Sequence, residues 1–295
     1  MIYDPLKCNM CPRECGADRV NGTGFCGCPD TMKINKIMLH HWEEPCISGK
    51  DGNRGSGAVF FSGCNLKCVF CQNRDISRSA EGKEYSPEDL ATAMRKLHDE
   101  GAYNINFVTP THYYPHILEA LDIYRPDIPI ISNTGGYEKA ETVKSLLGYF
   151  DIFLTDFKYG ESETAGKYSK ASDYTDHAIP ALCEMVRMTG KPEYDENGMM
   201  KKGVIVRHLV LPGSRRSSVE ALKLVAENVG TENVVLSLMS QYTPDFAPDT
   251  APLNRRITTF EYEYVRDAAL DMGFDGYSQD VRSAKKSYTP DFDKA

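Results

Sequence analysis

Short apolar runs alternate with longer stretches of helical spacing along most of the chain. Apolar runs of about four to eight residues that are bounded by turn signals are typical of buried strands. One stretch between the runs opens with Ser86, Pro87 and Asp89, which suit the N-cap, the first helical position and the return contact of a capping box. Further helices are predicted at residues 217–229 and 259–272. The predicted strands are residues 58–61, 104–109, 128–133, 151–158, 204–211 and 234–239.

The order of these patterns predicts a parallel sheet, because a helix between two strands returns the chain to the same edge. Six strand-and-helix units, rather than eight, predict an α/β fold with a partial (β/α)6 parallel barrel. A chain of 295 residues can bury one large core of this kind. We expect a small Cys-rich, metal-binding appendage at residues 1–50, the barrel at residues 51–280 and a tail at residues 281–295.

The composition narrows the class of protein. A hydrophobic fraction of 41% and a charged fraction of 26% are those of an ordinary globular domain. No apolar run is long enough to cross a membrane and the first residues lack a signal-peptide pattern, so we expect a cytoplasmic protein with no membrane partner. The net charge of −8 gives no general electrostatic footprint for nucleic acid.

The ten cysteines change this picture, because most of them cluster at the spacings of metal ligands. In a secreted chain they would suggest disulfides. In a chain without a secretory signal they favour metal, and with it a reducing, anaerobic environment.

The central motif is Cys64, Cys68 and Cys71, spaced C-x3-C-x2-C directly after the apolar run at residues 58–61. Cysteine thiolates are the usual protein ligands of iron–sulfur clusters, and a [4Fe–4S] cube takes four ligands. Three cysteines therefore leave one iron with an open position, where a substrate can bind. The alternatives are a zinc site completed from elsewhere and buried thiols without a metal.

A second group of cysteines lies in the first thirty residues, where two short Cys motifs flank a turn that contains glycine. So short a segment cannot bury a core of its own, which favours a structural metal. Zinc held by Cys8, Cys11, Cys15 and Cys26 is the first choice, with Cys28 as the rival ligand. A second iron–sulfur cluster is the competing identity, because cysteine ligands alone do not choose the metal. Unligated thiols are the remaining alternative.

Two adjacent histidines, His40 and His41, are followed by an isolated Cys46. Neighbouring side chains on a strand point to opposite faces, so the two histidines do not easily share one ion. We expect packing and hydrogen bonding for the two histidines and a structural role for Cys46, with a ligand role in the N-terminal metal site as the alternative for Cys46.

The C-x3-C-x2-C motif, with the aromatic Phe70 before its last cysteine, resembles the signature of the radical S-adenosylmethionine (SAM) enzymes. The chain is most similar to the pyruvate formate-lyase activating enzyme-like group, in its stand-alone branch with a Cys-rich N-terminus. The likeness extends from Cys8 to Gln279. It implies a partial barrel, a [4Fe–4S] cluster and SAM, whose amino and carboxylate groups chelate the open iron. In that family SAM is cleaved to methionine and a 5′-deoxyadenosyl radical, which removes a hydrogen atom from the substrate.

The predicted SAM contacts lie at the carboxyl ends of the strands, where parallel barrels carry their chemistry. The family often has a Gly-Gly-Glu-like segment after the second strand, and here Thr109-Pro-Thr-His112 replaces it. Alternation places Asp156 and Lys158 on one face of their strand. One of Arg207 and His208 must face inward. The resemblance suggests these SAM contacts: Phe70, Thr109, Thr111, His112, Asn133, Thr134, Asp156, Lys158, Arg207, Met239 and Gln241, with Tyr277 and Gln279 closing the same mouth.

The leading hypothesis is a radical SAM oxidoreductase that acts as an activase and installs a glycyl radical on a partner protein. Flavodoxin or ferredoxin would supply the electron. The alternative within chemistry is a radical SAM enzyme that modifies a small molecule or a peptide side chain. The non-enzyme alternative is an iron–sulfur electron carrier or a zinc-binding interaction module, although an electron carrier normally completes its four ligands.

Overall fold

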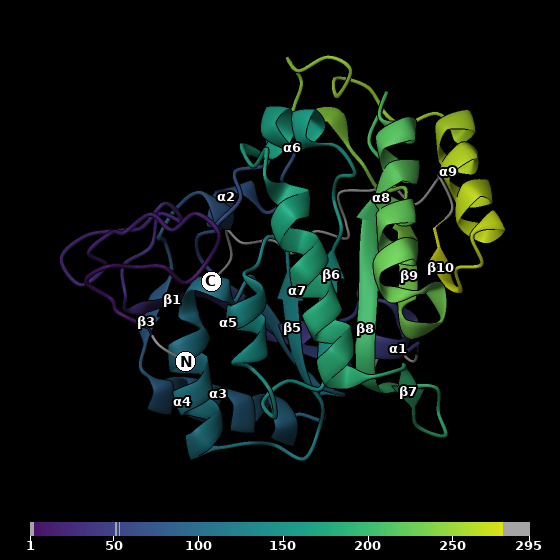
Figure 1. Cartoon of the computed structure of the whole chain (residues 1–295). Coiled ribbons are helices and arrows are strands. Elements are labelled where there is room, and N and C mark those ends of the chain that lie inside the picture. Colours follow the sequence, from purple (N-terminus) through teal and green to yellow (C-terminus); the bar gives the residue numbers. More distant parts are fainter. Residues whose placement is uncertain (1–2, 51, 53, 280–295) are drawn as a thin grey trace.

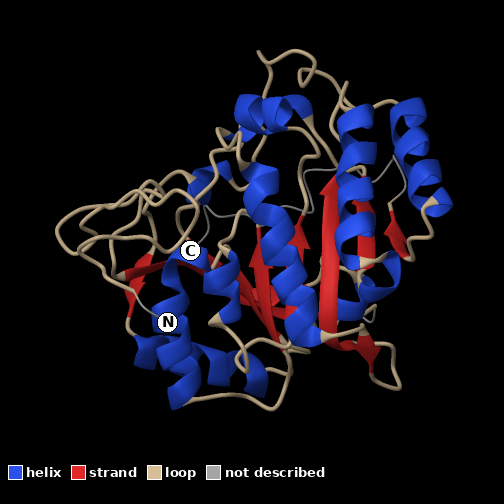
Figure 2. Cartoon of the chain, in the orientation of Figure 1, coloured by secondary structure: helices blue, strands red, loops and turns tan. Residues whose placement is uncertain are grey.

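The computed structural model describes residues 3–50, 52 and 54–279. The predicted tail at residues 281–295 lies outside the described residues. Figures 1 and 2 show a twisted sheet with helices along its outer face and an irregular N-terminal segment beside one edge.

The central sheet confirms the predicted parallel strands. Each strand is hydrogen-bonded in parallel to the next, in an order that follows the sequence. Their side chains are mostly buried, and such strands read as apolar runs in the sequence. The six strands are β2 (Ser56–Phe61), β4 (Ile105–Val108), β5 (Ile130–Thr134), β6 (Ile152–Asp156), β8 (Met200–Leu209) and β9 (Val235–Met239).

Short strands extend the sheet at both edges. β10 (Gly276–Ser278) runs parallel to β9. At the other edge, β1 (Met32–His40) is antiparallel to β2 and also pairs with β3 (Lys83–Tyr85). A two-residue strand, β7 (Glu193–Tyr194), pairs with β8. Because β3 and β10 stand at opposite ends of the strand order, the described sheet forms a partial barrel, as predicted.

Helices cover the outer face of the sheet. α3 begins after Ser86, whose side chain and that of Asp89 form the predicted capping box. The predicted helices at residues 217–229 and 259–272 are also present, with boundaries shifted by one or two residues. The helices are α1 (Pro45–Ser48), α2 (Arg74–Ser77), α3 (Pro87–Asp99), α4 (Tyr114–Ile123), α5 (Ala140–Lys144), α6 (Ser162–Ser169), α7 (Tyr174–Thr189), α8 (Arg215–Val229) and α9 (Thr259–Asp271).

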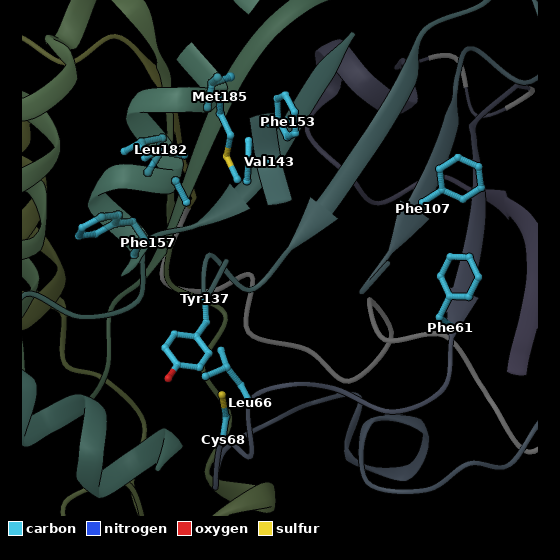
Figure 3. Packing of buried hydrophobic residues seen from close by; sticks show 14 of the residues in the cluster. Phe61, Leu66, Cys68, Phe107, Tyr137, Val143, Phe153, Phe157, Leu182 and Met185 are labelled. Carbon is cyan, nitrogen blue, oxygen red and sulfur yellow. The ribbon is translucent and has the colours of Figure 1, made fainter. Parts of the chain in front are cut away.

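The main core lies between these helices and the outer face of the sheet. Phe153 of β6 belongs to the same buried cluster as Val143, Leu182 and Met185 of the covering helices (Figure 3). This buried hydrophobic cluster also includes Leu66 and Cys68, which belong to the loop between β2 and α2. The loop that carries the central cysteines is therefore packed onto the core of the domain.

The inner face of the sheet surrounds a lumen whose lower end, at the start of the strands, is apolar. Cys46 and Ile47 of α1 pack there on side chains of four strands. His40, at the end of β1, packs edge-on against Phe60, with ring centroids 5.9 Å apart. Residues 32–48, which the sequence placed in the appendage, thus include a sheet strand and the helix that closes the lower lumen. The described helices include none with the length and apolar character of a membrane span.

Candidate active site

The three central cysteines occupy the loop between β2 and α2, which we call the cysteine loop or cluster loop. The loop turns at Gly63, whose φ of +79° favours glycine. A Cβ at this position would lie 2.4 Å from Cys28 Sγ, so the N-terminal segment also requires a glycine here. Cys64, Cys68 and Cys71 all line one cavity of about 240 Å³ at the carboxyl ends of the strands.

Polar groups lie against all three of these sulfurs, and the Ser77 hydroxyl is 3.4 Å from Cys71 Sγ. The Leu66 N–H donates to Cys64 Sγ at 3.3 Å, and the Ser169 hydroxyl donates to Cys68 Sγ at 2.9 Å. Burial raises the pKa of Cys64 and of Cys68, so metal binding must displace protons from these thiols, whereas the charge of Lys158 lowers the pKa of both. Donors and a cation of this kind stabilise metal-bound thiolates.

The cysteines fit a cluster better than a single ion. In the described part of the chain, no three His, Cys, Asp or Glu side chains are gathered as one metal ion would require. A zinc ion binds all its thiolates around one atom, at Zn–S distances of about 2.3 Å, whereas each thiolate of a [4Fe–4S] cube binds a different iron. Three thiols around one cavity, each with a polar group at its sulfur, match the second arrangement.

The cavity is also lined by paired charges. Asp156 accepts from Lys158 Nζ and from Arg207 Nε, the latter at 3.1 Å. Burial alone would raise the pKa of Asp156, but the charges of Lys158 and Arg207 lower it, so the carboxylate stays ionised. Arg207 NH2 also donates to Asn133 Oδ1 at 2.6 Å. Strands β5, β6 and β8 thus hold one hydrogen-bonded group beside the cysteines.

Two carboxylates that the sequence analysis missed lie below this group. Glu43 Oε2 is 3.2 Å from Arg207 NH1, and its Oε1 accepts from Asn106 Nδ2 at 3.0 Å and from Asn133 Nδ2 at 3.3 Å. Glu44 precedes α1 and is also buried. Burial raises the pKa of both carboxyl groups, and the Arg207 charge opposes the shift. The sequence analysis missed them because two adjacent acids before Pro45 indicate only the start of a helix.

Most of the predicted SAM contacts meet in this cavity. Its lining also includes residues that the analysis did not single out, among them Leu66, Gln72 and Asn73. The predicted residues that line it are Phe70, Thr109, Asn133, Thr134, Asp156, Lys158, Arg207, Met239 and Gln241.

Thr111 and His112 are not part of the cavity lining. The chain turns at Thr109, where φ is +60°, and the 3-10 helix Thr111–Tyr113 carries both side chains under the N-terminal segment. Thr111 donates to Glu138 Oε1 at 2.6 Å, and His112 Nε2 lies 2.8 Å from the Ser62 carbonyl oxygen.

Arg207 is the inward member of its pair. His208 faces the other way, with Nδ1 2.6 Å from the Phe157 carbonyl oxygen. The placement of Tyr277 at the mouth is wrong, because β10 pairs with the middle of β9 and sets Tyr277 against Cys46 at the lower end. Gln279 lies further along, where its Oε1 accepts from the Ser240 N–H at 3.1 Å.

The cysteines of the N-terminal segment are neighbours in space. A Cβ on Gly24 would lie 3.3 Å from Cys26 Sγ and 3.6 Å from Cys15 Sγ. Tight turns hold the other two, with Gly16 N–H donating to the Cys8 carbonyl and Glu14 N–H to the Cys11 carbonyl, both at 3.0 Å. The thiols are not gathered as one bound ion would need, so zinc at Cys8, Cys11, Cys15 and Cys26 stays a prediction.

Cys28, the rival ligand, faces the cluster loop instead. Its thiol is fully buried and donates to the Ser62 carbonyl at 3.0 Å. Further backbone contacts join the segment to the loop: the Cys64 N–H donates to the Cys26 carbonyl at 3.3 Å, and Arg13 Nε donates to the Asn65 carbonyl at 2.8 Å. The Cys-rich segment is therefore part of the support of the central cysteines.

The comparisons with known proteins agree with this geometry. The family model of the radical SAM superfamily matches residues 58–225, which hold the cysteine loop and the strand ends described above. The chain therefore belongs to the radical SAM superfamily, whose members use a [4Fe–4S] cluster and SAM.

Two individual proteins and one solved structure are also similar to the chain. The chain is 31% identical over 284 residues to the uncharacterized protein MJ0674 of Methanocaldococcus jannaschii, covering 91% of this chain and 77% of that protein. It is 22% identical over 226 residues to the uncharacterized protein MJ0808 of the same organism, covering 67% of this chain and 66% of that one. A radical SAM methyltransferase from Sphaerobacter thermophilus shares the fold, with a TM-score of 0.51, 15% identity, and coverage of 78% of this chain and 69% of that structure.

Proposed function

We propose that this protein cleaves SAM reductively and abstracts a hydrogen atom from a partner, as an activase that installs a glycyl radical on another protein. The observation that carries the chemistry is the single cavity that joins Cys64, Cys68 and Cys71 to the Asp156, Lys158 and Arg207 group. When bound by the three thiolates, the cluster supplies the electron that splits SAM into methionine and a 5′-deoxyadenosyl radical.

The residues of the chain bind and orient the ligand. Lys158 and Arg207 place two cations at the cavity wall, where the carboxylate of SAM needs a partner. Asp156 holds both cations through its two oxygens and offers a carboxylate for the SAM amino group. Thr134 and Asn133 add polar groups at the end of β5, and Phe70, Met239 and Gln241 line the cavity beside the adenosine.

Access to the cavity favours a polypeptide partner. Cys71, Gln72 and Asn73 are partly exposed, so the cluster loop reaches the surface at its third cysteine. The Cys-rich segment adds the exposed Phe25, which lies beside Lys67 of the same loop. A structural zinc ion in that segment would fix this surface, and flavodoxin or ferredoxin would deliver the electron.

The test adds a purified glycyl radical protein in its radical-free form to the reduced, cluster-loaded protein and SAM. We expect an organic radical signal in electron paramagnetic resonance (EPR), together with one 5′-deoxyadenosine for each radical formed. If 5′-deoxyadenosine forms but the protein radical does not, the activase assignment fails, and a small-molecule or peptide substrate takes its place.

A further inference from the structure

Glu43 reaches the lumen from outside the barrel's own strands. The chain leaves the sheet at the end of β1 (His40) and re-enters the lumen from below, where α1 closes its lower end. Glu43 precedes that helix, and its side chain, 9% exposed, lies among β4, β5 and β8, whose Asn106, Asn133 and Arg207 contact it. A buried carboxylate is costly unless it is paired, and two of its named partners, Asn133 and Arg207, line the proposed SAM cavity.

The contacts of Glu43 fix the orientation of Arg207. The guanidinium meets Glu43 through NH1, Asp156 through Nε and Asn133 through NH2. A planar guanidinium with three directional partners has one orientation available. Asp156 and Asn133 line the cavity, whereas Glu43 supports Arg207 from beneath.

The same group also sets the local charge. The charge of Arg207 acts on three carboxylates, Glu43, Glu44 and Asp156, whereas the charge of Lys158 acts on Asp156. His40, whose pKa burial lowers to about 4, adds no positive charge at neutral pH. Among the described residues, Glu44 Oε2 has no hydrogen-bond partner. Glu43, ion-paired with Arg207 at 3.2 Å, therefore places a negative charge beneath the cavity, where it favours a ligand with a net positive charge.

We propose that Glu43 is a positioning residue that fixes Arg207 beneath the SAM site and gives the cavity a preference for cationic SAM over neutral S-adenosylhomocysteine. The inference rests on the proposed function. SAM carries a sulfonium, an ammonium and a carboxylate, for a net charge of +1, whereas S-adenosylhomocysteine lacks the sulfonium charge. The two molecules differ only in the methyl group on sulfur and the charge that it creates, so the change of their affinity ratio between the wild type and a Glu43 variant reports the charge of the lumen.

The experiment measures the dissociation constants of SAM and S-adenosylhomocysteine by equilibrium dialysis with the cluster-loaded protein. A buried charge about 10 Å away, at an effective dielectric of about 20, changes binding by roughly tenfold. We expect Glu43→Gln to weaken SAM by about tenfold and S-adenosylhomocysteine by less than about twofold. The control is Glu14→Gln, which removes an exposed acid of the same N-terminal segment. Glu14 pairs with Lys139, so this variant should leave both dissociation constants unchanged.

A second variant separates charge from fold. Glu43→Asp keeps the charge and shortens the side chain, so it should weaken both ligands while the SAM preference stays within about twofold of the wild type. Equal weakening of both ligands by Glu43→Gln, or loss of the preference in Glu43→Asp, overturns the inference and leaves the proposed function standing. Absence of SAM binding by the cluster-loaded wild type overturns both.

Discussion

The two ends of the barrel lumen differ in what fills them. At the lower end, Cys46 and Ile47 pack on Ile131, Leu154 and other apolar side chains of the strands. At the upper end, Asp156, Lys158 and Arg207 line a cavity together with the cysteine loop. Packed apolar side chains stabilise a fold, whereas buried charges are costly unless they are paired. The contrast indicates that the lower end serves stability and the upper end serves a ligand.

The largest effect is expected from the lower end. Ile47 is fully buried, so Ile47→Ala leaves a cavity and should lower the free energy of unfolding by about 2–4 kcal/mol. Urea unfolding measures this loss, and Ile123→Ala, at a position that is 52% exposed, is the control. SAM affinity should stay within about twofold of the wild type. A loss of SAM affinity in an Ile47→Ala variant that is still fully folded would show that the two ends are not separate in function.

The next effect concerns the loop that follows β8 at the upper end. The Glu261 carboxylate accepts from the Gly213 N–H at 2.7 Å and from Arg255 NH1 and NH2 at 2.8 Å, which ties this loop to α9. Glu261→Gln should cost about 2 kcal/mol at pH 7, because a buried charge-assisted contact is lost. Arg255 and the backbone donors lower the pKa of Glu261 below its usual value.

The pH dependence of that loss has a definite sign. A carboxyl group with a lowered folded-state pKa contributes its full stability above its unfolded pKa of about 4.3 and loses it as the pH falls towards the folded value. Thermal melts of wild type and Glu261→Gln from pH 7 to pH 3 should therefore converge on the acidic side. A difference that is constant over this range would contradict the assignment.

A smaller effect is expected at the cavity wall. Lys158→Met removes one cation and leaves Asp156 paired with Arg207, so the fold should keep most of its stability. SAM affinity should fall by about tenfold, which corresponds to the loss of one charge-assisted contact. Equilibrium dialysis measures the affinity, and the Tm is the control for folding. Unchanged affinity would mean that Lys158, Asp156 and Arg207 pair with one another without contributing to SAM binding.

The smallest effect concerns the hydrogen bond from Ser169 to Cys68 Sγ. A donor at a ligand sulfur stabilises the more negative, reduced state of a cluster. Ser169→Ala should therefore lower the midpoint potential by about 40 mV, which is the equivalent of ~1 kcal/mol for one electron. A redox titration followed by EPR measures the potential, and Ser172→Ala is a matched control in the loop after α6. An unchanged or higher potential would argue against a cluster at Cys68.

The sequence predicted the main barrel because its parallel strands are buried on both faces and read as apolar runs. It did not predict β1 or β10, since β1 has a partly exposed face and β10 has only three residues. The capping box of α3 is a local feature, and the structure confirms it. Local patterns were therefore sufficient for most of the fold.

The site was less predictable, because its parts are distant in the sequence. Alternation correctly placed Asp156 and Lys158 together, and both line the cavity. No local pattern could bring Glu43 to Arg207, since that contact depends on how β1 and α1 return the chain to the lumen. The turn at Thr109 likewise moved His112 away from the cavity, and only the backbone geometry shows this.

The measurement that tests the central claim most directly is 5′-deoxyadenosine formation from SAM. The protein is reconstituted anaerobically and reduced, and Cys71→Ala is assayed beside it, with iron and sulfide content determined for both. The account predicts product from the wild type and none from the variant. A wild-type protein with a loaded cluster that forms no 5′-deoxyadenosine, with or without a glycyl radical protein, would contradict it.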